Sequence, residues 1–280
     1  MSNDFKRGAI YLLLAELLLA VMAALIKHVA PDVTHEVLVF SRNLFGLLAL
    51  LPLVLFKGVH TLKTHRLGVH FQRSLVGLIA MYGYFYVIAH LPLAESILVR
   101  LSAPFFLPII AFLWLGEKVR VRTVVAILIG FAGVVCVLRP GSDTFQPVAL
   151  IGIGAAALAS LAKVTIRDMA DTEPSHRVVF YFGLLATLVS AIPLTWGWQM
   201  PPPHTWIWLA LTGVAATGGQ LLLTRAYLIA NPGQIGPYTY VAVIYAALIG
   251  WLVWDEALLL TTLIGSALIV VSGVLNMKKP

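Results

Sequence analysis

Charge is scarce in this sequence of 280 residues. Only 11% of the residues are Asp, Glu, Lys or Arg, and 60% are hydrophobic, whereas roughly a quarter of the residues of a soluble domain are charged. Such a chain cannot hide its apolar surface from water, so a soluble fold is excluded and a membrane protein is expected. Basic residues in the connections between apolar segments then explain the net charge of +7, and no nucleic-acid partner is expected.

Cysteine and catalytic motifs are also scarce. Cys136 is the only cysteine, which excludes an intrachain disulfide framework and argues against a cysteine-based metal site. The 8 histidines show no metal-ligand spacing, and neither a phosphate-binding glycine loop nor a nucleophile elbow is present. We therefore expect no enzyme activity, no cofactor, no metal and no use of ATP by this chain itself.

Long apolar runs are abundant. About 20 apolar residues cross the hydrocarbon core as a helix, and connections between such runs are short. The predicted fold is an all-α membrane bundle of ten transmembrane helices without a water-soluble domain. The runs lie at residues 8–30, 36–56, 72–91, 95–115, 121–139, 149–170, 176–195, 205–229, 235–254 and 260–276.

The second half of the chain repeats the first. Residues 113–117 (Leu-Trp-Leu-Gly-Glu) match residues 252–256 (Leu-Val-Trp-Asp-Glu), and further matches divide the chain into repeats 1–140 and 141–280. Because each repeat has an odd number of predicted spans, the second enters the membrane from the opposite side. This predicts a 5+5 inverted-topology repeat, with a substrate site near the bilayer midplane where the repeats meet.

Lysine and arginine are distributed unevenly over the predicted connections. If the N-terminus is cytoplasmic, thirteen of the 19 lie at the cytoplasmic side, including Arg73 at the edge of the third span. Only Lys27 and Arg139 lie near the outer side. The asymmetry predicts an inner-membrane protein with both termini in the cytoplasm. The remaining four basic residues lie inside predicted spans: Arg42, Arg100, Lys163 and Arg225.

A charged side chain in hydrocarbon costs at least a few kcal/mol, so it needs a partner, water or a function. Glu16 is the only acid deep in a predicted span, and we interpret it as the proton-coupling group. Arg42, Arg100 and Lys163 are interpreted as groups that bind an anionic substrate. The alternative is that these cations extend to the interface or tie helices together, and that is the interpretation preferred for Arg225.

Polar and aromatic side chains extend the candidate substrate site. Tyr82 and Tyr86 share one face of the third span, and Tyr238 belongs to the ninth. A tyrosine offers a pocket both an apolar surface and a hydroxyl, although bundle packing or an interfacial belt is the alternative. Gln220 lies in a polar stripe on the eighth span.

Prolines and glutamates mark further positions in the fourth and ninth spans. Pro104 and Pro108 follow at four-residue steps from Arg100 and predict a helix kink that suits a cavity wall or a gate. Glu117 and Glu256 occupy the same position in the two repeats. We interpret both as structural, each favouring the N-terminus of the helix that follows it.

The chain resembles the EamA family of the drug/metabolite transporter superfamily. The resemblance is carried by residues 91–117 and 224–256, by the ending 264–273, and by Arg42 at the position of an arginine common early in the family's second helix. It implies ten helices in a 5+5 inverted repeat around a central cavity. It also places helices five and ten at the periphery, where they would form a homodimer.

The predicted function follows from the charges. Four cations against one acid in the spans favour a ligand with a carboxylate. We expect a secondary transporter in the lipid bilayer that exports a small amino acid or organic acid by alternating access to the midplane cavity, coupled to protons. Two alternatives stay open: an exporter of hydrophobic or cationic drugs, and a lipid-carrier flippase.

Overall fold

The computed structural model describes residues 3–103, 106, 109–110, 113, 121–138, 146–169, 172–229, 238, 241–256 and 260–277. Every regular element in these residues is a helix. The first half contains α1 (Asn3–Val29), α2 (His35–Lys57), the 3-10 helix η1 (Val59–Leu62), α3 (Leu67–His90), α4 (Leu93–Arg100) and α6 (Val121–Leu138). The second half contains α7 (Val148–Asp168), α8 (Ser175–Ala191), α9 (Leu194–Gly197), α10 (Thr205–Ile229), α12 (Val241–Trp254) and α13 (Leu260–Met277).

Each predicted apolar segment coincides with one of these helices. The segment predicted at 95–115 is covered only in its first part, by α4, so Pro104 and Pro108 lie outside the described residues and their kink stays a prediction. Among the described residues, three stretches are by themselves long and apolar enough to cross a membrane: Phe5–Val29, His35–Lys57 and Thr205–Leu223. The number of membrane crossings stays a prediction.

Proline and glycine set several helix boundaries. Pro31 follows the end of α1, and Pro92 and Pro174 directly precede α4 and α8. Proline has no N–H to leave unpaired at a helix start, and it disfavours helical geometry in the residue before it. The end of α2 is closed by Gly58 at φ +87°, a backbone conformation that a residue with a Cβ rarely adopts.

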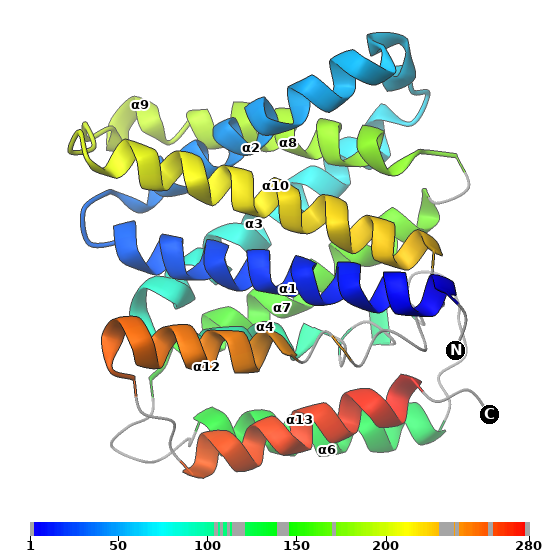
Figure 1. The fold of residues 1–280 in the computed structure, drawn as a ribbon, viewed down its shortest axis with the longest axis vertical. Helices are drawn as coiled ribbons and strands as arrows, with labels where there is room; N and C mark the ends of the chain where they lie inside the picture. The colour runs from blue at the N-terminus through cyan, green and yellow to red at the C-terminus, as the bar shows by residue number, and fades with distance from the viewer. Residues whose placement is uncertain are drawn as a thin grey trace.

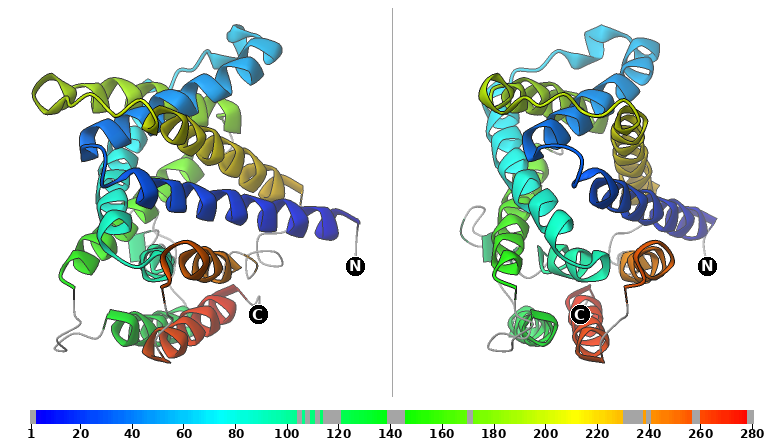
Figure 2. Two further views of the ribbon diagram at one scale, coloured as in Figure 1. Left: turned by 60° about the vertical axis from the view of Figure 1, so that its left-hand side comes forward. Right: turned by 90° about the vertical axis from the view of Figure 1, so that its left-hand side faces the viewer.

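The helices pack in a layered bundle (Figure 1). The most extensive contacts join α1 to α10, α6 to α13 and α3 to α7, and α2 packs on both α8 and α10. In turn, α12 packs on α1 and α4. The pair α6 and α13 pack mainly on each other and lie apart from the other helices in all views (Figures 1 and 2).

Glycines let α10 approach α1 and α2 closely. A Cβ atom at Gly213 would lie 2.6 Å from the backbone nitrogen of Gly46, and one at Gly219 would lie 3.3 Å from the carbonyl oxygen of Ala15. Small residues at helix crossings are typical of membrane bundles, because van der Waals contact holds those helices together. The contact at Gly219 thus brings α10 close to α1 at Ala15, the residue before Glu16.

The exterior of the bundle is apolar and part of its interior is polar. Phe56 is 91% exposed and Leu252 is 72% exposed, while Glu16 and Asn43 are buried. An apolar outer surface with polar groups turned inward is the arrangement that contact with lipid requires.

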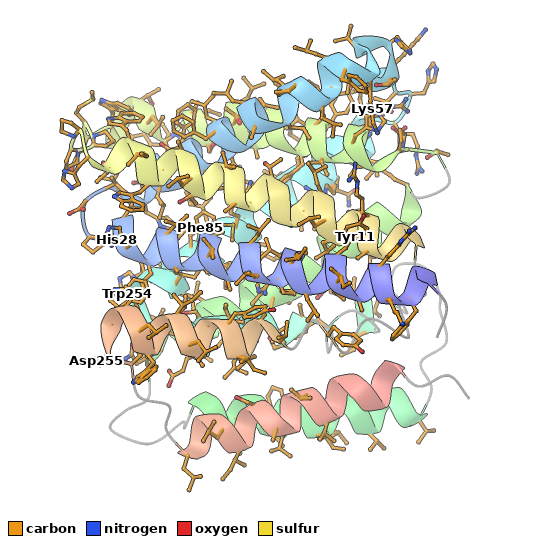
Figure 3. All side chains as sticks on the ribbon, in the orientation of Figure 1. Tyr11, His28, Lys57, Phe85, Trp254 and Asp255 are labelled. Carbon is orange, nitrogen blue, oxygen red and sulfur yellow. The ribbon has the colours of Figure 1, made fainter. Side chains whose placement is uncertain are left out.

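The bundle has two ends that serve as reference points. Figure 3 shows His28, Trp254 and Asp255 at one end, called here the Trp254 end, and Lys57 at the opposite end, called the Lys57 end. The first turn of α1 and the last turn of α13 both lie toward the Lys57 end (Figure 1).

Candidate functional site

The centre of the candidate site is an ion pair between α1 and α4. Nη2 of Arg100 donates a hydrogen bond to Oε2 of Glu16 over 3.2 Å. The Glu16 side chain is only 3% exposed, and Nε of Arg100 is buried without a hydrogen-bond partner. The structure therefore brings together two of the predicted site residues. The N–H at Nε of Arg100 remains free to donate a hydrogen bond.

Tyr84 on α3 lies within electrostatic range of both Arg100 and Glu16. The sequence analysis selected its neighbours Tyr82 and Tyr86 because those two share a helix face. That spacing rule does not reveal which face of α3 points toward Glu16, so Tyr84 was missed.

Arg42 and Arg73 form a second group of cations. Nη1 of Arg42 donates to Oδ1 of Asn43 over 2.9 Å, and the Arg73 guanidinium stacks 4.0 Å from the ring centre of Phe182 on α8. The two arginines are close enough for their like charges to repel each other. Nε of Arg42, together with Nε and Nη1 of Arg73, is buried without a hydrogen-bond partner in the described part of the protein.

Arg73 was counted among the cations at the cytoplasmic side, and that placement stays a prediction. Helix α3 begins at Leu67, five residues before the predicted start, so Arg73 lies in its second turn. A Cβ atom at Gly77 would lie 3.6 Å from Nη1 of Arg73. The side chain therefore extends toward the middle of α3 and not toward the near end of the helix.

Tyr82 and Tyr86 belong to a different aromatic group. Nε2 of His35 lies 2.9 Å from the backbone oxygen of Tyr82, and the His35 ring lies 5.4 Å from that of Tyr82 and 6.0 Å from that of Tyr86. Tyr86 also stacks on His90 at 4.1 Å. The structure thus groups these tyrosines with histidines near the Trp254 end, and their contact with substrate stays a prediction.

The remaining predicted site residues are dispersed. Tyr238 is exposed and makes an edge-to-face contact with Phe5, with ring centres 6.3 Å apart, near the start of α1. Gln220 is an exposed residue of α10, and Arg225 is exposed on the same helix. Lys163 lies in α7, but its side chain is outside the described part of the structure, so its role stays a prediction.

A network of polar contacts closes the Trp254 end. Lys27 pairs with Oε1 of Glu256, donates to the backbone oxygen of Leu91 over 3.0 Å, and lies 5.3 Å above the Trp254 ring. Oε2 of Glu256 accepts a 2.8 Å hydrogen bond from the N–H of Leu93, the first residue of α4. Glu256 thus caps the positive N-terminus of α4. Its predicted effect on the helix that follows it stays a prediction, because residues 257–259 lie outside the described part of the structure.

A second network closes the Lys57 end around Glu173, in the connection between α7 and α8. Its carboxylate accepts hydrogen bonds from Thr64 at 2.6 Å and Arg177 at 3.0 Å, and Nε2 of His70 lies 3.3 Å away. Burial alone would raise the pKa of the Glu173 carboxyl, but the hydrogen bonds from Thr64 and Arg177, together with the nearby His70, lower its pKa below the usual 4.5.

Apolar helices that enclose an ion pair and further cations are typical of a membrane-embedded carrier. The chain belongs to the EamA-like transporter family, whose model matches residues 6–139 and 146–277, and so to the drug/metabolite transporter superfamily.

Similar proteins are named as transporters of small molecules. The chain is 32% identical over 270 residues to the pseudopaline exporter CntI of Pseudomonas aeruginosa, covering 95% of this chain and 94% of that one. It is 28% identical over 234 residues to an S-adenosylmethionine uptake transporter of Rickettsia bellii, covering 82% and 79%. A solved crystal structure matches with a TM-score of 0.67 at 22% identity, covering 99% and 97%, and shares the fold.

Proposed function

We propose that this protein is a secondary transporter that exports an amino acid or small organic acid across the inner membrane in exchange for protons. The observation that carries this proposal is the ion pair between α1 and α4, in which the Glu16 side chain is 3% exposed and the Arg100 side chain is 30% exposed. An ionised pair in this setting is costly to keep unless it contributes to function, and both groups match the head of an amino acid.

An amino acid would insert into the pair. Its carboxylate would bind Arg100, whose planar guanidinium suits a carboxylate, and its ammonium would bind Glu16. The Tyr84 phenol lies within range of both groups. Each charge of the protein would then keep an opposite charge beside it in the empty and in the loaded carrier.

The same arrangement couples transport to protons. A proton on Glu16 removes the negative charge that holds the substrate ammonium, so proton and amino acid compete for one site. A site that faces the two sides of the membrane in turn, and that holds either a proton or an amino acid, exchanges one for the other across the membrane. An inward proton gradient then drives the amino acid outward, which accounts for export. An organic acid without an ammonium would bind only Arg100 and would not compete in this way, so amino acids are the preferred class.

The packing supports an alternating-access mechanism on an inverted repeat of residues 1–140 and 141–280. In chain order, the helices α1, α2, α3, α4 and α6 of the first half correspond to α7, α8, α10, α12 and α13 of the second. With this correspondence, the α1–α10 contact is equivalent to the α7–α3 contact, and the α1–α12 contact to the α7–α4 contact. Contacts α2–α8, α4–α12 and α6–α13 are each converted into themselves. The family model also matches each half separately.

Orientation and self-association complete the proposal. Both the start of α1 and the end of α13 lie toward the Lys57 end (Figure 1), which would face the cytoplasm by the distribution of basic residues. The peripheral pair α6 and α13 would provide the surface for a homodimer.

Transport in proteoliposomes tests the proposal. Efflux of radiolabelled amino acids should accelerate when the outside is acidic, so that protons move inward as the amino acid moves outward. Glu16→Gln should abolish this dependence on the proton gradient, and Arg225→Gln should retain it. Equal rates with and without the gradient, or an unchanged Glu16→Gln variant, would refute the proposed coupling.

Export of cationic drugs is the second candidate. It is favoured by Glu16, a buried acid within electrostatic range of the Tyr84 phenol. A lipophilic cation would need Glu16 but not Arg100. Transport inhibited by lipophilic cations, insensitive to amino acids and retained in Arg100→Gln would replace the amino-acid proposal with this one.

A further inference from the structure

The polar interior holds two groups of charged side chains, the Glu16–Arg100 pair and the two arginines Arg42 and Arg73, and this second group has no acid among the described residues. Glu16 neutralises Arg100, but no carboxylate of the described residues pairs with Arg42 or Arg73. Their buried N–H groups therefore lack both an acceptor and a counter-charge, and their mutual repulsion adds to the cost. Unpaired buried charges are expensive in a membrane bundle.

Contacts within the protein compensate for only part of this cost. The aromatic face of Phe182 attracts the Arg73 guanidinium, a cation–π contact that is weaker than an ion pair with a carboxylate would be. Asn43 gives its only side-chain acceptor to Arg42, which leaves its buried Nδ2 with two free donors. Arg42, Asn43 and Arg73 thus form a cluster that has donors and positive charge but lacks acceptors.

The direction of Arg73 excludes the simplest structural explanation. A lysine or arginine near a helix end commonly extends toward the nearest interface. Arg73 is six residues from the start of α3 yet extends the other way, so that Nη1 lies beside Gly77. The guanidinium is therefore carried into the bundle toward Phe182 and Arg42.

We propose that Arg42 and Arg73 form a second carboxylate site, and that the transported amino acid carries at least one further carboxylate group. This inference rests on the proposed function, because the Glu16–Arg100 pair takes the amino and carboxylate groups of the head. The bidentate geometry of two guanidinium groups suits a carboxylate with four acceptor positions.

The two sites lie along one face of α3. Arg73 and Tyr84 are eleven residues apart, which is three helical turns and about 16 Å at 1.5 Å per residue. A substrate that bridges them must be elongated, with the added carboxylate distant from its amino-acid head.

Binding of succinate tests the second site without involving Glu16, because succinate has two carboxylates and no ammonium. Purified protein in detergent should show saturable thermal stabilisation by succinate. Arg42→Gln and Arg73→Gln should weaken that binding roughly tenfold to a hundredfold, the range of a hydrogen bond to a charged group. Arg225→Gln, an exposed arginine on α10, is the matched control and should bind as the wild type does.

A transport series then tests the substrate class. L-Alanine has no further carboxylate, L-glutamate has one close to its amino-acid head, and γ-glutamyl-glutamate has further carboxylates at a distance from the head. The wild type should prefer γ-glutamyl-glutamate to both L-alanine and L-glutamate. Arg73→Gln should reduce γ-glutamyl-glutamate transport far more than L-alanine transport, a pattern that loss of folding would not produce. Arg73→Lys should restore part of the γ-glutamyl-glutamate transport.

The outcomes separate this inference from the proposed function. Absence of succinate binding to the wild type, or equal binding by the Arg73→Gln variant, overturns the second site whatever the amino-acid data show. Equal or tighter binding of inorganic phosphate overturns the carboxylate class. If succinate binding depends on Arg73 while no amino acid is transported, the site stands and the proposed function is refuted.

Discussion

The ends of the bundle and its middle treat buried charge differently. At the ends, Glu173 and Glu256 each accept hydrogen bonds from two donors, and all of these donors except Arg177 come from a distant segment of the chain. In the middle, Glu16 accepts one hydrogen bond from Arg100, and Arg42 and Arg73 have no acid at all in the described structure.

The difference indicates two roles. A charged group surrounded by its full set of partners fixes the connections between helices, and no binding capacity is left for a ligand. A charged group with unmatched hydrogen-bonding capacity costs stability and can gain it back only from a ligand or from water. Stability should therefore respond mainly to changes at the ends, and transport to changes in the middle.

The largest effect is expected from breaking the central pair. Arg100→Gln should reduce amino-acid transport by roughly a hundredfold, because truncating one partner of a buried charge pair costs about 2–5 kcal/mol. It should also lower the thermal midpoint, since Glu16 is left buried without a counter-charge. The double variant Glu16→Gln/Arg100→Gln should recover stability without recovering transport. Equal stabilities of the single and double variants would contradict the ion-pair interpretation.

The Trp254 end should show the opposite pattern. Glu256→Gln removes the charge that pairs with Lys27 and weakens the cap on α4, so the free energy of unfolding should decrease by about 2 kcal/mol. Transport per folded molecule should stay within twofold of the wild type. Thermal unfolding and proteoliposome assays measure the two quantities.

The neighbouring Asp255 provides the matched control for Glu256. It is exposed and sits at φ 55°, a conformation that asparagine tolerates as well as aspartate. Asp255→Asn should therefore leave stability unchanged, and a loss equal to that of Glu256→Gln would show that the region, and not the carboxylate, is sensitive.

The Lys57 end should give stability a dependence on acid pH. The pKa of Glu173 is lowered in the folded protein, so at acid pH the folded protein binds fewer protons than the unfolded chain does. Its contribution is complete above the usual carboxyl pKa of 4.5 and is lost as pH decreases through the lowered folded pKa. Glu173→Gln should cost about 1 kcal/mol near neutral pH and show a smaller further loss on acidification than the wild type. Parallel pH profiles for the two proteins would contradict this.

The helices could be predicted from sequence because the length of an apolar run is a local property. The partners of the charged residues could not be predicted in the same way. The link from Glu256 to the Leu93 N–H joins α12 to α4 across the two repeats, and no spacing within one segment encodes it. The position of Arg73 depended on where α3 begins and on the space beside Gly77, which only packing against α8 defines.

The smallest effect distinguishes two tyrosines on one helix. Tyr84 lies within electrostatic range of Glu16 and Arg100. Tyr86 instead stacks on His90. Tyr84→Phe removes only a hydroxyl, so transport should fall severalfold, in line with about 1 kcal/mol for one hydrogen bond. Tyr86→Phe should leave transport unchanged, because its contacts are made by the ring. The reverse order, measured as initial rates in proteoliposomes, would move the substrate path from the Tyr84 face of α3 to the face that the spacing of Tyr82 and Tyr86 predicts.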